Sequence, residues 1–340
     1  MPSDTKTYQE ETYIDNTIRL RGVLNTMPDF ARDYFRAIEP TTSTKTRISY
    51  AYDIRIFFQF LISQNPSLAK IGIPNLNVSV LDQLKPIDIE EYMEYLKLYD
   101  SPNDQTTITN GERGLKRKIS SLRSFYTYYY KRQAIETNPV QLVDMPKIHD
   151  KAIIRLDAGE TAALLDYIEH CGDQLTGQRK AYYEKTKLRD LAIVTLLLGT
   201  GIRVSECVGL DVEDIDFRNN GIRLIRKGGS EMVVYFGPEV EKALKDYLEA
   251  RKAISPLEGH EHALFYSTQR KRIGVQAVEN LVKKYARAIT TTKKITPHKL
   301  RSTYGTTLYQ ETGDIYLVAD VLGHKDVNTT KKHYAAMDDA

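Results

Sequence analysis

The sequence predicts a mainly α-helical protein with two domains, the second of which contains a small antiparallel sheet. The chain has 340 residues, which exceeds one ordinary domain and suffices for two separate cores. Apolar residues recur at helical spacing in several segments, whereas short β-rich runs separated by glycine turns occur between residues 215 and 236. A polar stretch that holds Pro146, D-M-P-K-I-H-D-K-A at 144–152, divides the two patterns and is typical of a linker.

These boundaries predict four parts of the chain. We expect a helical N-terminal extension over 1–40, a helical domain over 41–143, a linker over 144–155 and a second domain over 156–340. Within the extension, helical pieces are expected around 16–25 and 29–38. No internal repeat is evident.

The first domain is expected to be helical because its apolar residues follow a 3.6-residue period. The residues that carry this pattern are Tyr50, Ile54, Phe57, Phe58 and Leu61 in one helix and Ile119, Leu122, Phe125 and Tyr126 in another. A third helix is expected over 87–98, and D-Q-T-T-I-T-N-G at 104–111 is interpreted as a loop that ends in helix-start signals. The tyrosine run 126–130 could stack on bases, but at helical spacing two or three of its members are expected in the core.

The second domain is expected to begin with helices and to continue into the sheet. An apolar helix over 188–198 should stop at Gly199 and Gly201, after which Arg203 opens a turn and a short helix. The runs 215–217, 222–226 and 232–236 predict antiparallel strands, which would place Lys227 at a hairpin tip.

The remaining segment of the second domain is expected to be helical again. Val278, Leu281, Val282, Tyr285 and Ile289 mark one helix. Thr296 and Pro297 are start signals for a helix that ends near Gly313. Gly323 is expected to terminate a helix just before His324, and Asn328 to cap a short final helix that carries Tyr334.

Composition excludes several classes of protein. No stretch approaches the 18 or more apolar residues of a membrane span, and the polar start M-P-S-D-T-K-T is no signal peptide, so we expect a cytoplasmic protein without a membrane partner. The two cysteines, Cys171 and Cys207, fit a reducing compartment and do not build a zinc site. Cys207 lies among apolar residues, where a packed and inert thiol is favoured over a nucleophile.

The distribution of charge indicates nucleic acid more strongly than the net charge of +3 does. No acidic residue occurs between Glu279 and Glu311 or between Arg113 and Arg132, and both segments are rich in Lys and Arg. Either segment alone could be a solvated helix face. The pair favours a two-sided grip on DNA. The expected contacts are Lys45, Arg47, Lys116, Arg117, Lys118 and Arg123 in the first domain and Lys283, Lys284, Arg287 and Lys299 in the second.

Six residues in the last third of the chain could carry out phosphoryl transfer. They lie in T-G-I-R-V-S-E at 200–206, R-K-G-G at 226–229, T-P-H-K-L-R-S-T at 296–303 and L-G-H-K-D-V-N-T-T-K-K-H-Y at 322–334. Arginine forks bind phosphate oxygens, lysine and histidine transfer protons, and a tyrosine can attack phosphorus. His298 and Arg301 are three residues apart and are expected on one face of the first helical turn, where backbone N–H groups favour an anion.

These segments resemble the tyrosine recombinase family of phage integrases and Xer proteins, whose site is written R…K…H-x-x-R…H/W…Y. The resemblance extends to 44–61 and 116–130, which are similar to the first and last helices of the family's core-binding domain. It covers roughly residues 40–336 and is specific because six residue types occur in the right order with the right neighbours. Within the family, the long N-terminal region, R-K-G-G and T-P-H-K-L-R are most similar to Xer proteins that act alone. The implied fold is a helical core-binding (SAM-like) domain followed by a mixed α/β catalytic domain.

The resemblance implies a role for each residue of the set. Arg203 and Arg301 would hold the nonbridging oxygens of the scissile phosphate, with Glu206 orienting Arg203. Lys227 would be the general acid, His298 would transfer protons, His324 would hydrogen-bond the phosphate, and Tyr334 would be the nucleophile. No metal, other cofactor or ATP is implied. Tyr334 follows His324 by ten residues, whereas Xer members commonly use nine, a spacing that His333 would fill.

The implied partners are duplex DNA with paired inverted-repeat sites and three further copies of the chain in a tetramer. An accessory protein or a DNA translocase is a further candidate. Six residues follow Tyr334, whereas family members generally continue into a C-terminal helix that docks on the neighbouring subunit.

Alternatives to a self-sufficient Xer protein of chromosome dimer resolution remain open at this point. One is the integrase of a phage or conjugative element, a second is a type IB topoisomerase, and a third is an architectural DNA-binding protein.

Overall fold

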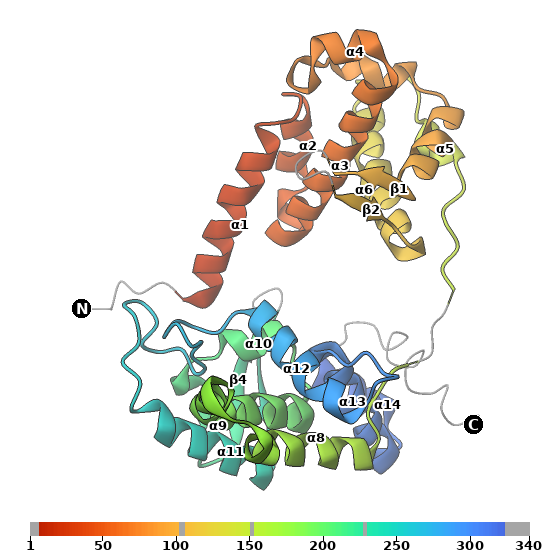
Figure 1. Cartoon of the computed structure of the whole chain (residues 1–340). Helices are drawn as coiled ribbons and strands as arrows, with labels where there is room; N and C mark the ends of the chain where they lie inside the picture. The colour runs from red at the N-terminus through yellow and green to blue at the C-terminus, as the bar shows by residue number, and fades with distance from the viewer. Residues whose placement is uncertain (1–6, 102–105, 150–152, 227–229, 324–340) are drawn as a thin grey trace. The chain divides into compact units, whose positions relative to one another are not determined.

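The computed structural model describes residues 7–101, 106–149, 153–226 and 230–323. The chain divides into two compact units, Met1–Lys151 and Ala152–Ala340 (Figure 1). Lys227, His324, Tyr334 and the expected final helix lie outside the described residues.

Unit 1 is helical and contains one small hairpin. Its elements are α1 (Tyr8–Leu24), α2 (Ala31–Ala37), α3 (Thr44–Gln64), α4 (Pro66–Ile71), α5 (Pro86–Tyr95), β1 (Leu98–Asp100), β2 (Thr107–Thr109), α6 (Glu112–Lys131) and α7 (Pro139–Leu142). Short 3-10 turns occupy Glu39–Thr41, Ile73–Asn75 and Val78–Gln83.

The core of unit 1 lies between α3 and α6, the two helices with the clearest apolar period. Phe57, Phe125 and Tyr126 are almost fully buried there, as the spacing predicts. Of the tyrosine run, Tyr126 and Tyr129 are in the core. The region before residue 41 is part of the same core, because Leu20, Val23, Met27, Tyr34 and Phe35 are buried in it.

The hairpin β1–β2 corrects the sequence prediction for this region. The helix expected over 87–98 ends at Tyr95, and Leu98–Asp100 pairs antiparallel with Thr107–Thr109, inside the segment interpreted as a loop. The β-branched run T-T-I-T favours a strand, and Tyr99 is buried with its ring stacked on Tyr95 at 5.3 Å between centroids. The helix-start signals at the end of this segment are nevertheless confirmed, because α6 begins at Glu112 with Gly111 as its N-cap.

Unit 2 is mostly helical and contains a small sheet. Its elements are α8 (Ala158–His170), α9 (Gly177–Thr200), α10 (Val204–Gly209), β3 (Ile215–Asp216), β4 (Gly221–Ile225), β5 (Glu231–Tyr235), α11 (Pro238–Arg251), α12 (Val275–Ile289), α13 (Pro297–Thr312) and α14 (Ile315–Leu322). Short 3-10 turns occupy Cys171–Gln174 and Val212–Asp214. The expected mainly α fold with a small antiparallel sheet is confirmed.

Helix α9 is the centre of unit 2 and packs against α8, α11 and α13. The sequence predicted only its apolar half, because its first two turns are polar. Gly199 lies within the helix and does not stop it, and a Cβ there would come within 2.5 Å of Val240 on α11. Gly201 ends the helix in the left-handed conformation.

The three-stranded sheet has the order β3-β4-β5 and is antiparallel throughout. Ile222 pairs with Val234, and both are buried with Leu224 on the face that packs on the core. The register holds Ile225 opposite Glu231, so β4 ends directly before the R-K-G-G segment and β5 begins shortly after it.

In the described ranges, no helix is both long and apolar enough to cross a membrane.

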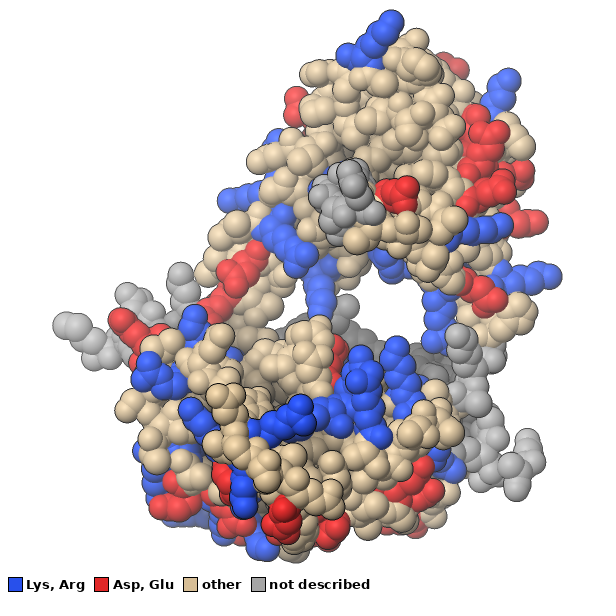
Figure 2. Space-filling model, in the orientation of Figure 1, with Lys and Arg blue, Asp and Glu red and all other residues tan. Residues whose placement is uncertain are grey.

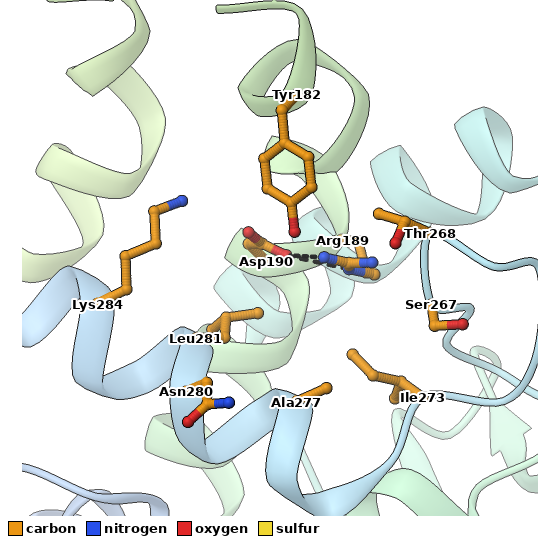
Figure 3. A pocket seen from close by; sticks show the side chains of 10 residues that line it. All are labelled: Tyr182, Arg189, Asp190, Ser267, Thr268, Ile273, Ala277, Asn280, Leu281 and Lys284. Atoms are coloured by element: carbon orange, nitrogen blue, oxygen red, sulfur yellow. Dashed lines mark hydrogen bonds and ion pairs between the residues drawn. The ribbon is translucent and has the colours of Figure 1, made fainter. Parts of the chain in front are cut away.

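A polar network joins α9, α12 and the segment before α12. Arg189 donates to Asp190 Oδ1 at 2.7 and 3.0 Å and to the carbonyl of Tyr266 at 2.9 Å. Tyr285 donates its hydroxyl to Asp190 Oδ2 at 3.0 Å. Arg189 and Asp190 line a hollow of about 430 Å³, to which Lys284 of α12 also contributes (Figure 3). Asp190 thus supplies the counter-charge of Arg189 and the acceptor of the Tyr285 hydroxyl.

Replacing Asp190 is therefore expected to destabilise unit 2 strongly. Asp190→Ala should lower the free energy of unfolding by about 3–5 kcal/mol, because it leaves a buried guanidinium without its counter-charge. Urea unfolding of the full chain measures this loss. Glu249→Ala removes an exposed carboxylate of α11 that pairs with Lys252 and is the control, with an expected change within about 0.5 kcal/mol. Equal effects of the two substitutions would contradict the structural role of Asp190.

Candidate active site

The turn after α9 places Arg203. Gly201 has φ of +61°, and a Cβ there would come within 2.3 Å of Tyr304 and 3.0 Å of Leu322, so only glycine fits between α13 and α14. The chain then reverses and Arg203 becomes the N-cap of α10. This agrees with the predicted turn and short helix.

Glu206 holds Arg203 in place through two contacts. Its Oε2 accepts from the backbone N–H of Arg203 at 2.7 Å, and its Oε1 accepts from Nη1 at 2.8 Å. The Glu206 side chain is only 8% exposed, whereas that of Arg203 is 38% exposed. The carboxylate is thus a buried support and the guanidinium faces the solvent in part, where it can meet a ligand.

Arg301 comes from the second turn of α13 and is buried. Its Nη1 donates to the carbonyl of Gly201 at 2.5 Å and its Nη2 to the carbonyl of Leu322. The guanidinium thereby contacts the ends of α9 and α14. His298, in the first turn of α13, is exposed. Their spacing of three residues on α13 keeps the shared face as an expectation.

The carboxyl end of α14 is surrounded by arginines from three other elements. Arg203 donates Nη2 to the carbonyl of Gly323 at 3.2 Å, Arg301 donates to Leu322, and Arg226 donates Nη2 to Val321 at 2.7 Å. The last carbonyls of a helix lack partners within the helix and carry its negative end, so cations are favoured there by about 0.3–1 kcal/mol each. Gly323 ends the helix with φ of +61°, as its sequence predicted.

This arrangement concentrates positive charge at one place. Three guanidiniums meet around one buried carboxylate, that of Glu206, and around helix carbonyls that carry only partial charge. Arginine stays charged at any relevant pH and binds phosphate with a planar fork. The chain continues from this cluster directly to His324 and, ten residues later, to Tyr334. The arrangement can hold an anion with a phosphodiester's geometry.

Within the described part of the chain, no group of three or more His, Cys, Asp or Glu side chains could hold a metal ion. The described carboxylate at the cluster, Glu206, is bonded to Arg203.

Unit 2 also carries a basic surface on α12. Lys283, Lys284 and Arg287 are exposed there, and Lys299 of α13 is half-buried. Lys284 Nζ lies 4.2 Å from the centroid of the Tyr285 ring. Figure 2 shows Lys and Arg side chains gathered on one part of this unit's surface.

Unit 1 presents fewer cations to solvent than the sequence suggests. Lys45 and Lys116 are exposed, as expected of contacts. Lys118 is instead buried, with Nζ 3.3 Å from Asp53 Oδ1, so its ammonium is neutralised inside the unit. Arg117 pairs with the other oxygen of Asp53 while its side chain stays 46% exposed.

Two further expected contacts have partners inside unit 1. Arg47 is buried and lies 3.0 Å from Glu39. Arg123 donates to the carbonyl of Val140 at 3.1 and 3.3 Å and to that of Val143 at 2.9 Å, which ties α6 to α7. The structure therefore assigns Arg47, Lys118 and Arg123 to packing and leaves the solvent-facing positions to Lys45, Lys116 and Arg117.

Asp53 is the residue of this region that the sequence reasoning missed. It lies four residues before Phe57, on the apolar stripe of α3, and is almost fully buried. A carboxylate at a core position opposite a basic helix is a recognisable signal for a buried ion pair. Burial raises the pKa of the Asp53 carboxyl, and Lys118 and Arg117 oppose that shift.

Comparison with known proteins identifies the family. The profile of the phage integrase family matches residues 155–340, which is more than half of the chain. The chain belongs to the phage integrase family. The match covers the arginine cluster and every residue of the predicted catalytic set.

Relatives of known type extend the similarity to both units. The chain is 33% identical over 319 residues to tyrosine recombinase XerC of Caldanaerobacter subterraneus subsp. tengcongensis, covering 91% of this chain and 82% of that protein. It is 29% identical over 344 residues to tyrosine recombinase XerS of Lactococcus lactis subsp. cremoris, covering 95% of each. This phage integrase family member is thus a tyrosine recombinase, an enzyme of site-specific recombination.

Solved structures agree with the fold. The Tn1549 transposon integrase in complex with transposon right end DNA has a TM-score of 0.62 at 20% identity, covering 88% of this chain and 93% of that one. The XerH site-specific recombinase bound to palindromic difH substrate has a TM-score of 0.60 at 18% identity, with coverages of 85% and 75%.

Cys207 lies on α10, four residues after Arg203, and is fully buried. Its thiol is therefore expected to be unreactive. Burial raises its pKa to about 12, so the thiolate is scarce at neutral pH. Iodoacetamide should alkylate the partly exposed Cys171 in the folded protein and should modify Cys207 only after denaturation. Mass spectrometry of tryptic peptides measures both sites. Alkylation of native Cys207 as fast as of Cys171 would contradict its burial.

Proposed function

We propose that this tyrosine recombinase cuts and rejoins duplex DNA at a specific site through a covalent 3′-phosphotyrosyl intermediate. The observation that carries the proposal is the cluster of Arg203, Arg226 and Arg301 at the carboxyl end of α14, directly before His324. A cluster of guanidiniums at this point of the chain favours a bound phosphate close to the segment that bears Tyr334.

Arg203 and Arg301 are the proposed ligands of the scissile phosphate. A fork-shaped guanidinium can meet two nonbridging oxygens, and its charge stabilises the additional negative charge of the pentacoordinate transition state. Arg203 is held by Glu206, and Arg301 by the carbonyls of Gly201 and Leu322. Both side chains are thus placed before DNA binds, which reduces the reorganisation that catalysis requires.

Tyr334 is the proposed nucleophile. Its phenol oxygen would attack phosphorus and form the bond to the 3′ phosphate, while the bond to the 5′ oxygen breaks. Lys227 would protonate that leaving oxygen, and His298 would transfer a proton at the attacking and leaving oxygens. His324 would hydrogen-bond the phosphate. Attack by the 5′ hydroxyl of a second strand reverses these steps, so the bond energy is conserved without ATP.

The proposed DNA contacts are the Lys and Arg residues of the expected set whose side chains reach the solvent. Lys45, Lys116 and Arg117 serve unit 1, and Lys283, Lys284, Arg287 and Lys299 serve unit 2. The structural neighbours in complex with DNA support a duplex as the partner. Arg47, Lys118 and Arg123 are left out because their charged groups are bonded inside unit 1.

We further propose that four copies join two inverted-repeat sites and exchange strands through a Holliday junction. The XerC and XerS relatives support an Xer role in chromosome dimer resolution. The similarity to the Tn1549 transposon integrase keeps the mobile-element integrase as the second candidate. Sequencing of the genomic fragments that the protein selects distinguishes them. A site at the replication terminus would support the Xer role, and the end of a mobile element would support the integrase.

The covalent step is tested with a nicked suicide duplex built on the selected fragment. Wild-type protein should form a protein–DNA adduct that resists denaturant, and Tyr334→Phe should form none, because phenylalanine has no attacking oxygen. His333→Phe is the matched control for the alternative spacing and should still form the adduct. Adduct with the Tyr334→Phe variant would reject the nucleophile assignment.

DNA binding is tested through its dependence on salt. Lys45→Glu and Lys116→Glu should each weaken binding and lower the slope of log affinity against log salt by about 1, because each phosphate contact releases counterions. Lys252→Glu reverses an exposed charge on α11 outside the basic surfaces and should change neither quantity. An unchanged slope in the first two variants would reject the proposed contacts of unit 1.

The type IB topoisomerase alternative gives a different result in one assay. A recombinase should yield recombinant product only from plasmids with two cognate sites, in EDTA and without ATP. Relaxation of site-free plasmids at comparable rates, with no recombinant product, would favour the topoisomerase.

A further inference from the structure

Arg226 is the last described residue after β4, and both its backbone and its side chain are fixed. Its backbone N–H donates to the carbonyl of Ser230 at 2.8 Å and so extends the pairing of β4 with β5. Its guanidinium donates Nη2 to the carbonyl of Val321 at 2.7 Å and Nη1 to that of Asp320 at 3.4 Å. One residue therefore joins the end of the sheet to the end of α14.

Gly323 makes room for this contact. Its φ of +61° favours glycine, and a Cβ built there would lie 1.5 Å from Nη1 of Arg226. The guanidinium thus packs directly over the residue that precedes His324. Gly323 therefore both ends α14 and allows the contact between Arg226 and that helix.

The guanidinium of Arg226 is partly buried, so its charge destabilises the fold unless neighbouring groups compensate for the lost solvation. Burial lowers its pKa, Arg203 lowers it further, and Glu206 opposes both effects. The carbonyls at the negative end of α14 supply part of the compensation. Both Nη1 and Nη2 donate to these carbonyls, which holds the guanidinium against the end of α14.

We propose that Arg226 is a positioning residue that fixes the end of β4 on the carboxyl end of α14, and with it the attachment point of Lys227. The inference rests on the proposed function, in which Lys227 protonates the leaving oxygen. Arg226 and Lys227 share a peptide bond, so the contact of Arg226 with α14 restricts the position of the Lys227 backbone nitrogen. Arg226 itself does not contact the phosphate.

The test compares two forms of the nicked suicide duplex. One has an ordinary phosphodiester at the cleaved position and the other a 5′-bridging phosphorothiolate, whose sulfur leaves without protonation. Arg226→Ala should slow cleavage of the phosphodiester by about 10- to 100-fold, the usual loss when an orienting group is removed. The phosphorothiolate should restore most of the rate, as it should for Lys227→Ala.

Two further variants separate positioning from other roles. Arg226→Lys keeps a positive group that can donate to a helix carbonyl, and it should cleave the phosphodiester faster than Arg226→Ala does. Arg223→Ala removes an arginine of the same strand, whose side chain is 57% exposed and lies 3.0 Å from Asp214, and should leave both rates unchanged. DNA affinity should be equal in Arg226→Ala and Arg223→Ala, and both variants should remain folded at the assay temperature, as circular dichroism measures.

The outcomes distinguish this inference from the function on which it rests. Rescue of Lys227→Ala without rescue of Arg226→Ala would overturn the inference alone, because Arg226 would then act on the phosphate or on the fold. An Arg226→Ala rate equal to wild type would overturn it as well. Failure of the phosphorothiolate to rescue Lys227→Ala would instead reject Lys227 as the acid.

Discussion

The arrangement of the site depends on how the carboxyl end of one short helix is held. Helix α14 ends in carbonyls that have no partners within the helix, and Arg203, Arg226 and Arg301 donate to them from three separate elements. The contacts fix α10, the end of β4 and α13 relative to each other within unit 2. Because cations are favoured at this end of a helix, the fold can hold three like charges together before any phosphate is bound.

Two glycines allow this convergence. Gly201 lets the end of α9 approach Tyr304 and Leu322, and Gly323 lets the guanidinium of Arg226 lie over the end of α14. A buried carboxylate supports the exposed arginine in unit 2, and the same device occurs in unit 1, where Asp53 pairs with Lys118 and with the half-exposed Arg117. In both units a buried anion orients a cation that faces the solvent.

Much of this could be predicted from the sequence, because the relevant signals are local. The glycine stops at 201, 313 and 323, the strand runs and the helical periods each depend on neighbouring residues. The contacts of Arg203 and Arg226 with α14 could not, since they join residues 120 and 95 positions apart. The burial of Lys118 was readable in part, because it lies three residues after Leu115 and four before Leu122, on the apolar stripe of α6. The hairpin at Tyr99 was missed, because its two strands are only three residues long and are defined by their pairing with each other.

The central claim is that the arginine cluster holds a phosphate which Tyr334 attacks. Its most direct test is mass spectrometry of the adduct trapped on the suicide duplex, after digestion with nuclease and trypsin. If Tyr334 is the nucleophile, the tryptic peptide 333–340 should carry a residual nucleotide linked to Tyr334. A nucleotide on any other peptide, or cleavage that needs a divalent metal and leaves no linked peptide, would contradict it.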